Sequence, residues 1–110
     1  MTDKVLVFNG LSAVADTIEA FYESPALGNG TKIKTFTASN DTLTSQSYKA
    51  YIYNSAGVAA KSVVPFTIVV RDTADYGASI IGQVIPTGGT LRIESSNASG
   101  LNFYVTGVDL

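Results

Sequence analysis

Residues 91–106 read LRIESSNASGLNFYVT and carry the clearest structural pattern in the chain. Apolar and polar side chains alternate on both sides of the link SSNASG, which is the period of a β-strand with one buried face. Because the link is short and polar and contains Gly100, we predict that the two segments form an antiparallel hairpin. The predicted inward-facing residues are Leu91, Ile93, Leu101, Phe103 and Val105.

Similar segments occur upstream of this pair. Residues 79–85 are predicted to form a strand that stops at Pro86, which would make the carboxyl-terminal third a three-stranded meander. Residues 62–72 are predicted to form a long strand, and Pro65 should lie at a sheet edge, at a bulge or where the strand begins. Further strands are predicted at residues 31–39 and 44–54, and a strand is favoured at residues 17–24, although residues 13–21 would also tolerate one helical turn.

The composition favours the same structure, since Val, Ile and Thr make up 31 of the 110 residues. These side chains lose rotamer freedom in a helix and pack well on a pleated sheet. Seven to eight short strands predict an all-β fold, an antiparallel two-sheet β-sandwich of jelly-roll or immunoglobulin-like kind. We expect residues 1–110 to form a single domain, in which residues 1–16 are either a docking arm or the first strand.

Several classes of chemistry are excluded by composition. The chain has no His and no Cys, which removes disulfides, His-based catalytic triads and the usual zinc, iron–sulfur and haem ligands. A net charge of −2 argues against binding to nucleic-acid phosphates, which needs clustered Lys and Arg. No stretch approaches the ~20 apolar residues of a membrane span. We therefore expect no cofactor, no metal, no nucleic acid and no membrane partner.

An enzyme would need converging carboxylates, and Asp72, Asp75 and Glu94 are the acidic residues best suited to that role. A calcium loop would need several more oxygen ligands at regular spacing. Arg71 also stands beside Asp72 as a competing partner. The sequence therefore predicts that the protein is not an enzyme.

Two kinds of apolar surface are candidates for binding other molecules. Residues 5–8 form the earliest continuous apolar run. Strand alternation places Tyr51 and Tyr53 with Lys49 on one face, opposite a face that contains Tyr48. Adjacent Tyr rings on one face offer flat, amphipathic surface. The candidate interaction residues are Val5, Leu6, Val7, Phe8, Tyr51, Tyr53 and Tyr104.

Residues 79–110, SIIGQVIPTGGTLRIESSNASGLNFYVTGVDL, resemble the carboxyl-terminal half of small structural proteins of tailed-bacteriophage virions. Those proteins often pair a P-x-G-G-T-L-x-I turn and strand with a final strand that ends in V-x-G-V/I-x. The segment YKAYIYNSAG at residues 48–57 adds a looser match.

The resemblance implies a non-enzymatic role in a virion assembled in the host cytoplasm, such as capsid decoration (cement) or attachment in the head, neck or tail. Its implied partners are further copies of the chain, as a homo-oligomer, and other virion structural proteins. The alternative is a carbohydrate-binding β-sandwich module, in which Tyr51, Tyr53 or Tyr104 would stack on a glycan.

Overall fold

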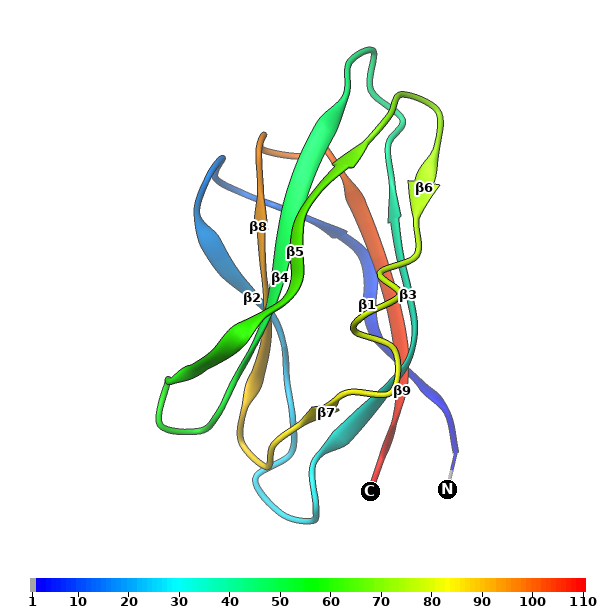
Figure 1. The fold of residues 1–110 in the computed structure, drawn as a ribbon. Coiled ribbons are helices and arrows are strands. Elements are labelled where there is room, and N and C mark those ends of the chain that lie inside the picture. Colours follow the sequence, from blue (N-terminus) through cyan, green and yellow to red (C-terminus); the bar gives the residue numbers. More distant parts are fainter. Residues whose placement is uncertain (1) are drawn as a thin grey trace.

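The computed structural model describes residues 2–110, except for the side chains of residues 60–62. Its strands form two antiparallel sheets that pack face to face, which confirms the predicted all-β sandwich (Figure 1). None of the described segments is a helix long and apolar enough to cross a membrane. The nine strands of the described residues are β1 (Lys4–Leu11), β2 (Ile18–Glu23), β3 (Thr31–Ser39), β4 (Gln46–Tyr53), β5 (Ala59–Val69), β6 (Ala74–Asp75), β7 (Val84–Ile85), β8 (Thr90–Ser95) and β9 (Asn102–Asp109).

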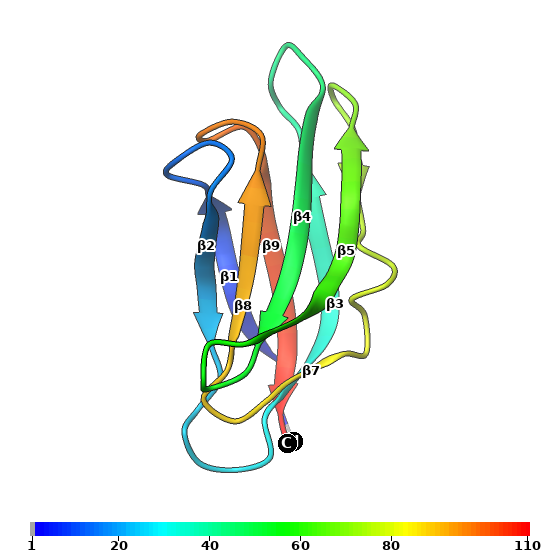
Figure 2. The ribbon, with the colours of Figure 1, turned by 60° about the vertical axis from the view of Figure 1, so that its left-hand side comes forward.

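The strand order is that of a jelly roll. Sheet 1 has the order β1-β9-β3, with the short strands β6 and β7 both paired to β3, and sheet 2 has the order β2-β8-β4-β5. Early strands thus pair with late ones, as when a long antiparallel ribbon is wrapped around a core. In an immunoglobulin-like sandwich the first two strands are neighbours, whereas here they lie in different sheets. Figure 2 shows sheet 2 in front, with β5 at its edge.

The predicted hairpin of residues 91–106 is wrong. β8 lies between β2 and β4 in sheet 2, and β9 lies between β1 and β3 in sheet 1. The polar link therefore crosses the sandwich, a gap of roughly 10 Å that six residues span easily. The inward face itself was predicted correctly, because Leu91, Ile93, Leu101, Phe103 and Val105 are all buried.

The predicted strand at residues 79–85 is also wrong, and with it the three-stranded meander. Two consecutive turns replace most of the strand: the amide of Ile80 donates to the carbonyl of Gly77 (2.9 Å), and that of Gln83 donates to the carbonyl of Ile80 (3.1 Å). Gly77 and Gly82 have positive φ, which favours turns over a strand. Ile80 reaches the core from this turn, and only β7 pairs with a strand.

The remaining predicted strands are present with small differences at their ends. β3 has the predicted bounds, and β2, β4 and β5 fall within a few residues of theirs. β5 is an edge strand, and its register against β4 shifts between Thr67 and Val64, so Pro65 lies in a bulge. Because Pro65 lies in this bulge, its missing amide removes no hydrogen bond between β4 and β5, and the predicted position at an edge or a bulge is confirmed.

The core lies between the two sheets and is centred on aromatic rings. Phe103 from β9 contacts Tyr48 from β4 and Phe21 from β2, each with ring centroids 5.5 Å apart. Phe36 from β3 stacks on Tyr48 at 5.7 Å. These rings join strands of both sheets, so the sandwich is fixed by side chains that are far apart in the sequence.

Of the two alternatives for the amino-terminal segment, the structure shows the first strand. β1 pairs antiparallel with β9 of its own chain. Lys4 and Asp109 form an ion pair (2.7 Å) that joins the two ends of the chain, which lie close together in Figure 1. The carboxylate of Asp109 also accepts a hydrogen bond from Thr31 (2.9 Å). The first strand is thus held by backbone pairing and by side chains.

Candidate functional site

The first strand divides the predicted interaction residues 5–8 into two pairs. Register shifts against β9 allow Leu6 and Val7, which are consecutive, both to point into the core. These two residues are therefore not available to a partner. Val5 and Phe8 remain exposed, and the Phe8 ring lies edge-on to Tyr104, 6.0 Å between centroids. The structure thus brings Phe8 and Tyr104 together on the outer face of sheet 1.

Tyr51 and Tyr53 share one face of β4, as alternation predicted, and that face is the outer face of sheet 2, while Tyr48 on the opposite face is buried. Tyr51 donates a hydrogen bond to Glu94 of β8 (3.0 Å). Burial, followed by that hydrogen bond, raises the pKa of Tyr51. The guanidinium of Arg92 lies 4.1 Å from the centre of the Tyr53 ring. Both tyrosines are therefore engaged by side chains of the neighbouring strand.

The geometry of the pair does not form one flat platform. The rings of Tyr51 and Tyr53 are inclined at 66° with centroids 6.3 Å apart. Arg92 covers one face of Tyr53. A sugar ring that stacks on one tyrosine would therefore meet the other at a steep angle. The contacts are those of a cross-strand ladder, which stabilises a sheet by roughly 0.2–1 kcal/mol per pair.

A third apolar surface was not predicted as an interaction site. Phe66, Ile68 and Val70 are 62%, 59% and 55% exposed along β5 and the residue after it. Ile68 lies opposite Ser47 in the register of β4, so its side chain shares the outer face of sheet 2 with Ser47. Three large apolar side chains thus line the edge of the sandwich.

Two shallow depressions adjoin this surface. One, about 320 Å³, is lined by Phe66, Ile68 and small polar side chains that include Ser47. The other, about 170 Å³, lies between Phe66 and the charged residues Lys49 and Glu94. The small side chain of Ser47 on β4 leaves both hollows beside the large apolar residues of β5.

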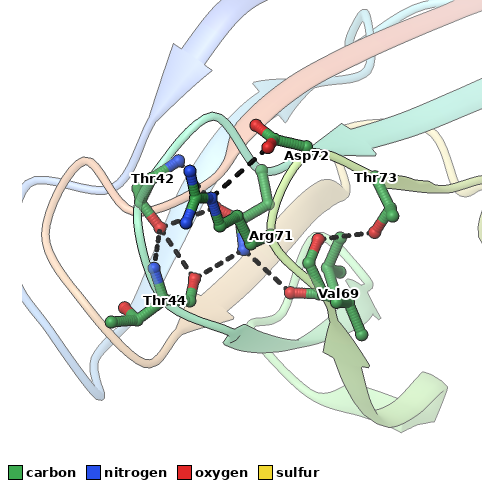
Figure 3. Close-up of polar contacts among 8 residues, drawn as sticks. Thr42, Thr44, Val69, Arg71, Asp72 and Thr73 are labelled. Atoms are coloured by element: carbon green, nitrogen blue, oxygen red, sulfur yellow. Dashed lines mark hydrogen bonds and ion pairs between the residues drawn. The ribbon is translucent and has the colours of Figure 1, made fainter.

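The end of β5 is fixed by polar contacts between two loops. The buried amide side chain of Asn40 donates to the carbonyls of Thr44 (2.9 Å) and Val69 (2.8 Å). Figure 3 labels Thr44 and Val69, whose carbonyls accept these two hydrogen bonds. Thr73 returns toward β5 and donates from its hydroxyl and its amide to the carbonyl of Val70. These contacts fix the position of the last residues of β5.

The acidic residues considered for catalysis do not converge. Asp72 is exposed and pairs with Arg71 (3.3 Å), visible in Figure 3. Asp75 accepts a hydrogen bond from the Tyr48 hydroxyl (2.5 Å), and Glu94 accepts one from Tyr51 on the far side of sheet 2. Among the described residues, no three His, Cys, Asp or Glu side chains come together as metal ligands.

Comparison with family models, with curated proteins and with solved structures finds no match for this chain.

Proposed function

We propose that the chain is a non-enzymatic structural protein of a bacteriophage virion, which binds neighbouring subunits of a capsid or tail in a decoration, cement or attachment role. The observation that carries the proposal is the exposure of large apolar side chains on both outer faces of the sandwich. Phe8, at 77% exposed, stands beside Tyr104 on sheet 1, and Phe66 and Ile68 line the edge of sheet 2. Grouped apolar residues of this kind are typical of surfaces that bind other proteins.

The dispersed carboxylates support a structural role over catalysis. Asp72 and Asp75 each have a partner, Arg71 and Tyr48 respectively, and those partners give each carboxylate a local structural role. The bacteriophage context rests on the resemblance of residues 79–110 and 48–57 to small virion proteins.

The test is whether the protein is part of a particle. Antibodies raised against the purified chain would be applied to density-gradient fractions of virions produced from the genome that carries its gene. We expect the chain in the virion band, in a fixed ratio to the major capsid protein. A chain found only in the soluble fractions contradicts the proposal.

One observation favours a carbohydrate-binding module as the second candidate. The exposed Phe66 borders a depression that is also lined by the polar residues Glu94, Lys49 and Ser47. An aromatic wall beside polar groups is a common way to hold a sugar. Saturable binding to a glycan array that is lost in Phe66→Ala and kept in Phe8→Ala would favour this candidate.

A further inference from the structure

Along residues 63–70, the β5 edge of sheet 2 has few of the features that usually keep a sheet edge from pairing with another chain. β5 pairs only with β4 among the described strands. Residues 63–70 read VVPFTIVV and contain no charge. Natural edges are commonly protected by Lys or other charged residues, by short strands or by a covering loop. Within residues 63–70 the only protective residue is Pro65, in its bulge, and Lys61 precedes the run in the same strand.

The hydrogen bonds of β4 show which backbone groups of β5 point outward. Ser47 uses its amide and its carbonyl on Ser96, which lies on the β8 side of β4. Backbone groups alternate in direction along a strand, so the neighbours of Ser47 on β4 point toward β5. Ile68, opposite Ser47, therefore directs its own amide and carbonyl away from β4, toward the open edge.

Some of the outward groups are already used within the chain. The carbonyl of Val63 accepts a hydrogen bond from Ser79 (2.6 Å), so the loop that contains Ser79 covers the lower part of the edge. The carbonyl of Val70 accepts from Thr73. Both groups of Ile68, the carbonyl of Phe66 and the amide of Val70 are left to point outward between these two contacts.

We propose that β5 pairs antiparallel with β5 of a second copy of this chain, about a twofold axis at Ile68. This register joins the amide and carbonyl of each Ile68 to those of its counterpart. It also directs the amide of each Val70 to the carbonyl of Phe66 in the other copy. The Val70 carbonyl, which Thr73 already occupies, would lie at the outer end of the pairing.

The side chains and charges fit a second copy. Each exposed Ile68 would lie beside its counterpart, and each Phe66 beside Val70 of the other copy, so apolar residues cover apolar residues. Arg71, the first charged residue after the run, would fall opposite Pro65, and no like charges would face each other. The two four-stranded sheets would become one eight-stranded sheet through an isologous interface.

This inference deepens the proposed function and rests on it for its biological setting, but it is tested on the purified protein alone. The chain has no Cys, so Ile68→Cys introduces a single thiol at the twofold axis. Directly opposite residues of antiparallel strands lie about 5.5 Å apart at Cα, within the range of a disulfide. Leu43→Cys, at a 78% exposed loop position, is the matched control.

We expect mild oxidation to convert Ile68→Cys into a covalent dimer while Leu43→Cys stays largely monomeric. Light scattering during size-exclusion chromatography should show a dimer for the wild type and Leu43→Lys, and a monomer for Ile68→Lys with an unchanged circular dichroism spectrum.

A monomeric wild type at all concentrations, or a dimer that survives Ile68→Lys, overturns the inference. If Ile68→Lys does not fold, the crosslinking result decides: equal dimer yields from the two cysteine variants also overturn it. A monomeric wild type that is nevertheless present in virions would leave the proposed function standing.

Discussion

Ser47 and Ile68 lie directly opposite each other on β4 and β5 but direct their backbone groups away from one another. Ser47 is satisfied by Ser96, whose amide donates to its carbonyl at 2.9 Å. Ile68 faces the open edge of the sheet. Ser47 therefore completes hydrogen bonding within sheet 2, whereas Ile68 directs its backbone groups and an exposed apolar side chain to the edge of that sheet.

Tyr48→Phe should destabilise the fold by ~1.5–3 kcal/mol, because the Tyr48 hydroxyl donates to the carboxylate of Asp75 and joins sheet 2 to sheet 1. Burial and Asp75 both raise the pKa of Tyr48, so the hydroxyl stays protonated and donating at ordinary pH. Urea denaturation measures the loss. Tyr51→Phe is the control and should cost under ~1 kcal/mol, since the Tyr51 hydroxyl lies on the outer face. Equal losses for the two variants would contradict the stabilising role of the Tyr48–Asp75 hydrogen bond.

Phe103→Ala should cost ~3–5 kcal/mol, because the ring is fully buried and touches Phe21, Phe36 and Tyr48. Such a loss approaches the total stability of a small domain. Thermal melting followed by circular dichroism is sufficient to detect it. A loss below ~1 kcal/mol would show that the two sheets do not meet at this ring.

Deletion of residues 1–9 should unfold the protein, since it removes most of β1 and the buried side chains of Leu6 and Val7. Phe8→Ala, which changes an exposed residue of the same strand, should keep the fold. Circular dichroism of both variants separates the two effects. A truncated protein that melts like the wild type would restore the docking-arm alternative for this segment.

Stability should fall in acid partly because of Asp109. Hydrogen bonds from Lys4 and Thr31 lower the pKa of Asp109 below its ordinary value of 3.8. A depressed carboxyl pKa contributes stability above the unfolded-state pKa, and that contribution is lost as the pH falls through the folded-state pKa. Asp109→Asn should therefore flatten the acid limb of a stability-against-pH curve below pH 3.8. High salt should reduce the difference between Asp109→Asn and the wild type, because the Lys4–Asp109 ion pair is exposed. If the acid limb of Asp109→Asn is identical to that of the wild type, Asp109 does not contribute to the loss of stability in acid.

The sequence predicted which side chains face inward better than it predicted which strands are neighbours. Alternation at Leu91 and Phe103 fixes the buried face, because the side-chain period is two. The same alternation is satisfied whether the polar link at residues 95–100 turns within one sheet or crosses to the other. Strand partners are set by long-range contacts such as the one between Phe21 and Phe103, which no local pattern contains.

The candidate surfaces show a similar division. Strand alternation placed Tyr51 and Tyr53 with Lys49 on one face, and the structure shows that this face is the outer one. In VVPFTIVV both faces are apolar, so the pattern could not tell that Phe66 and Ile68 point outward. Their exposure follows from the register of β5 against β4, which turns Phe66 and Ile68 to the outer face and Val64 and Val69 to the core. The uncharged run that ends at Arg71 was the signal that could have indicated an unprotected edge.

Backbone amide exchange at Ile68 tests the central claim, that the β5 edge pairs with another copy, most directly. The Ile68 amide points away from β4, whereas the amide of Thr67 points toward Tyr48. By nuclear magnetic resonance, we expect the Ile68 amide to exchange quickly in dilute protein and to become protected as the concentration rises, while Thr67 stays protected throughout. An Ile68 amide that exchanges at the same rate at every concentration would contradict the account.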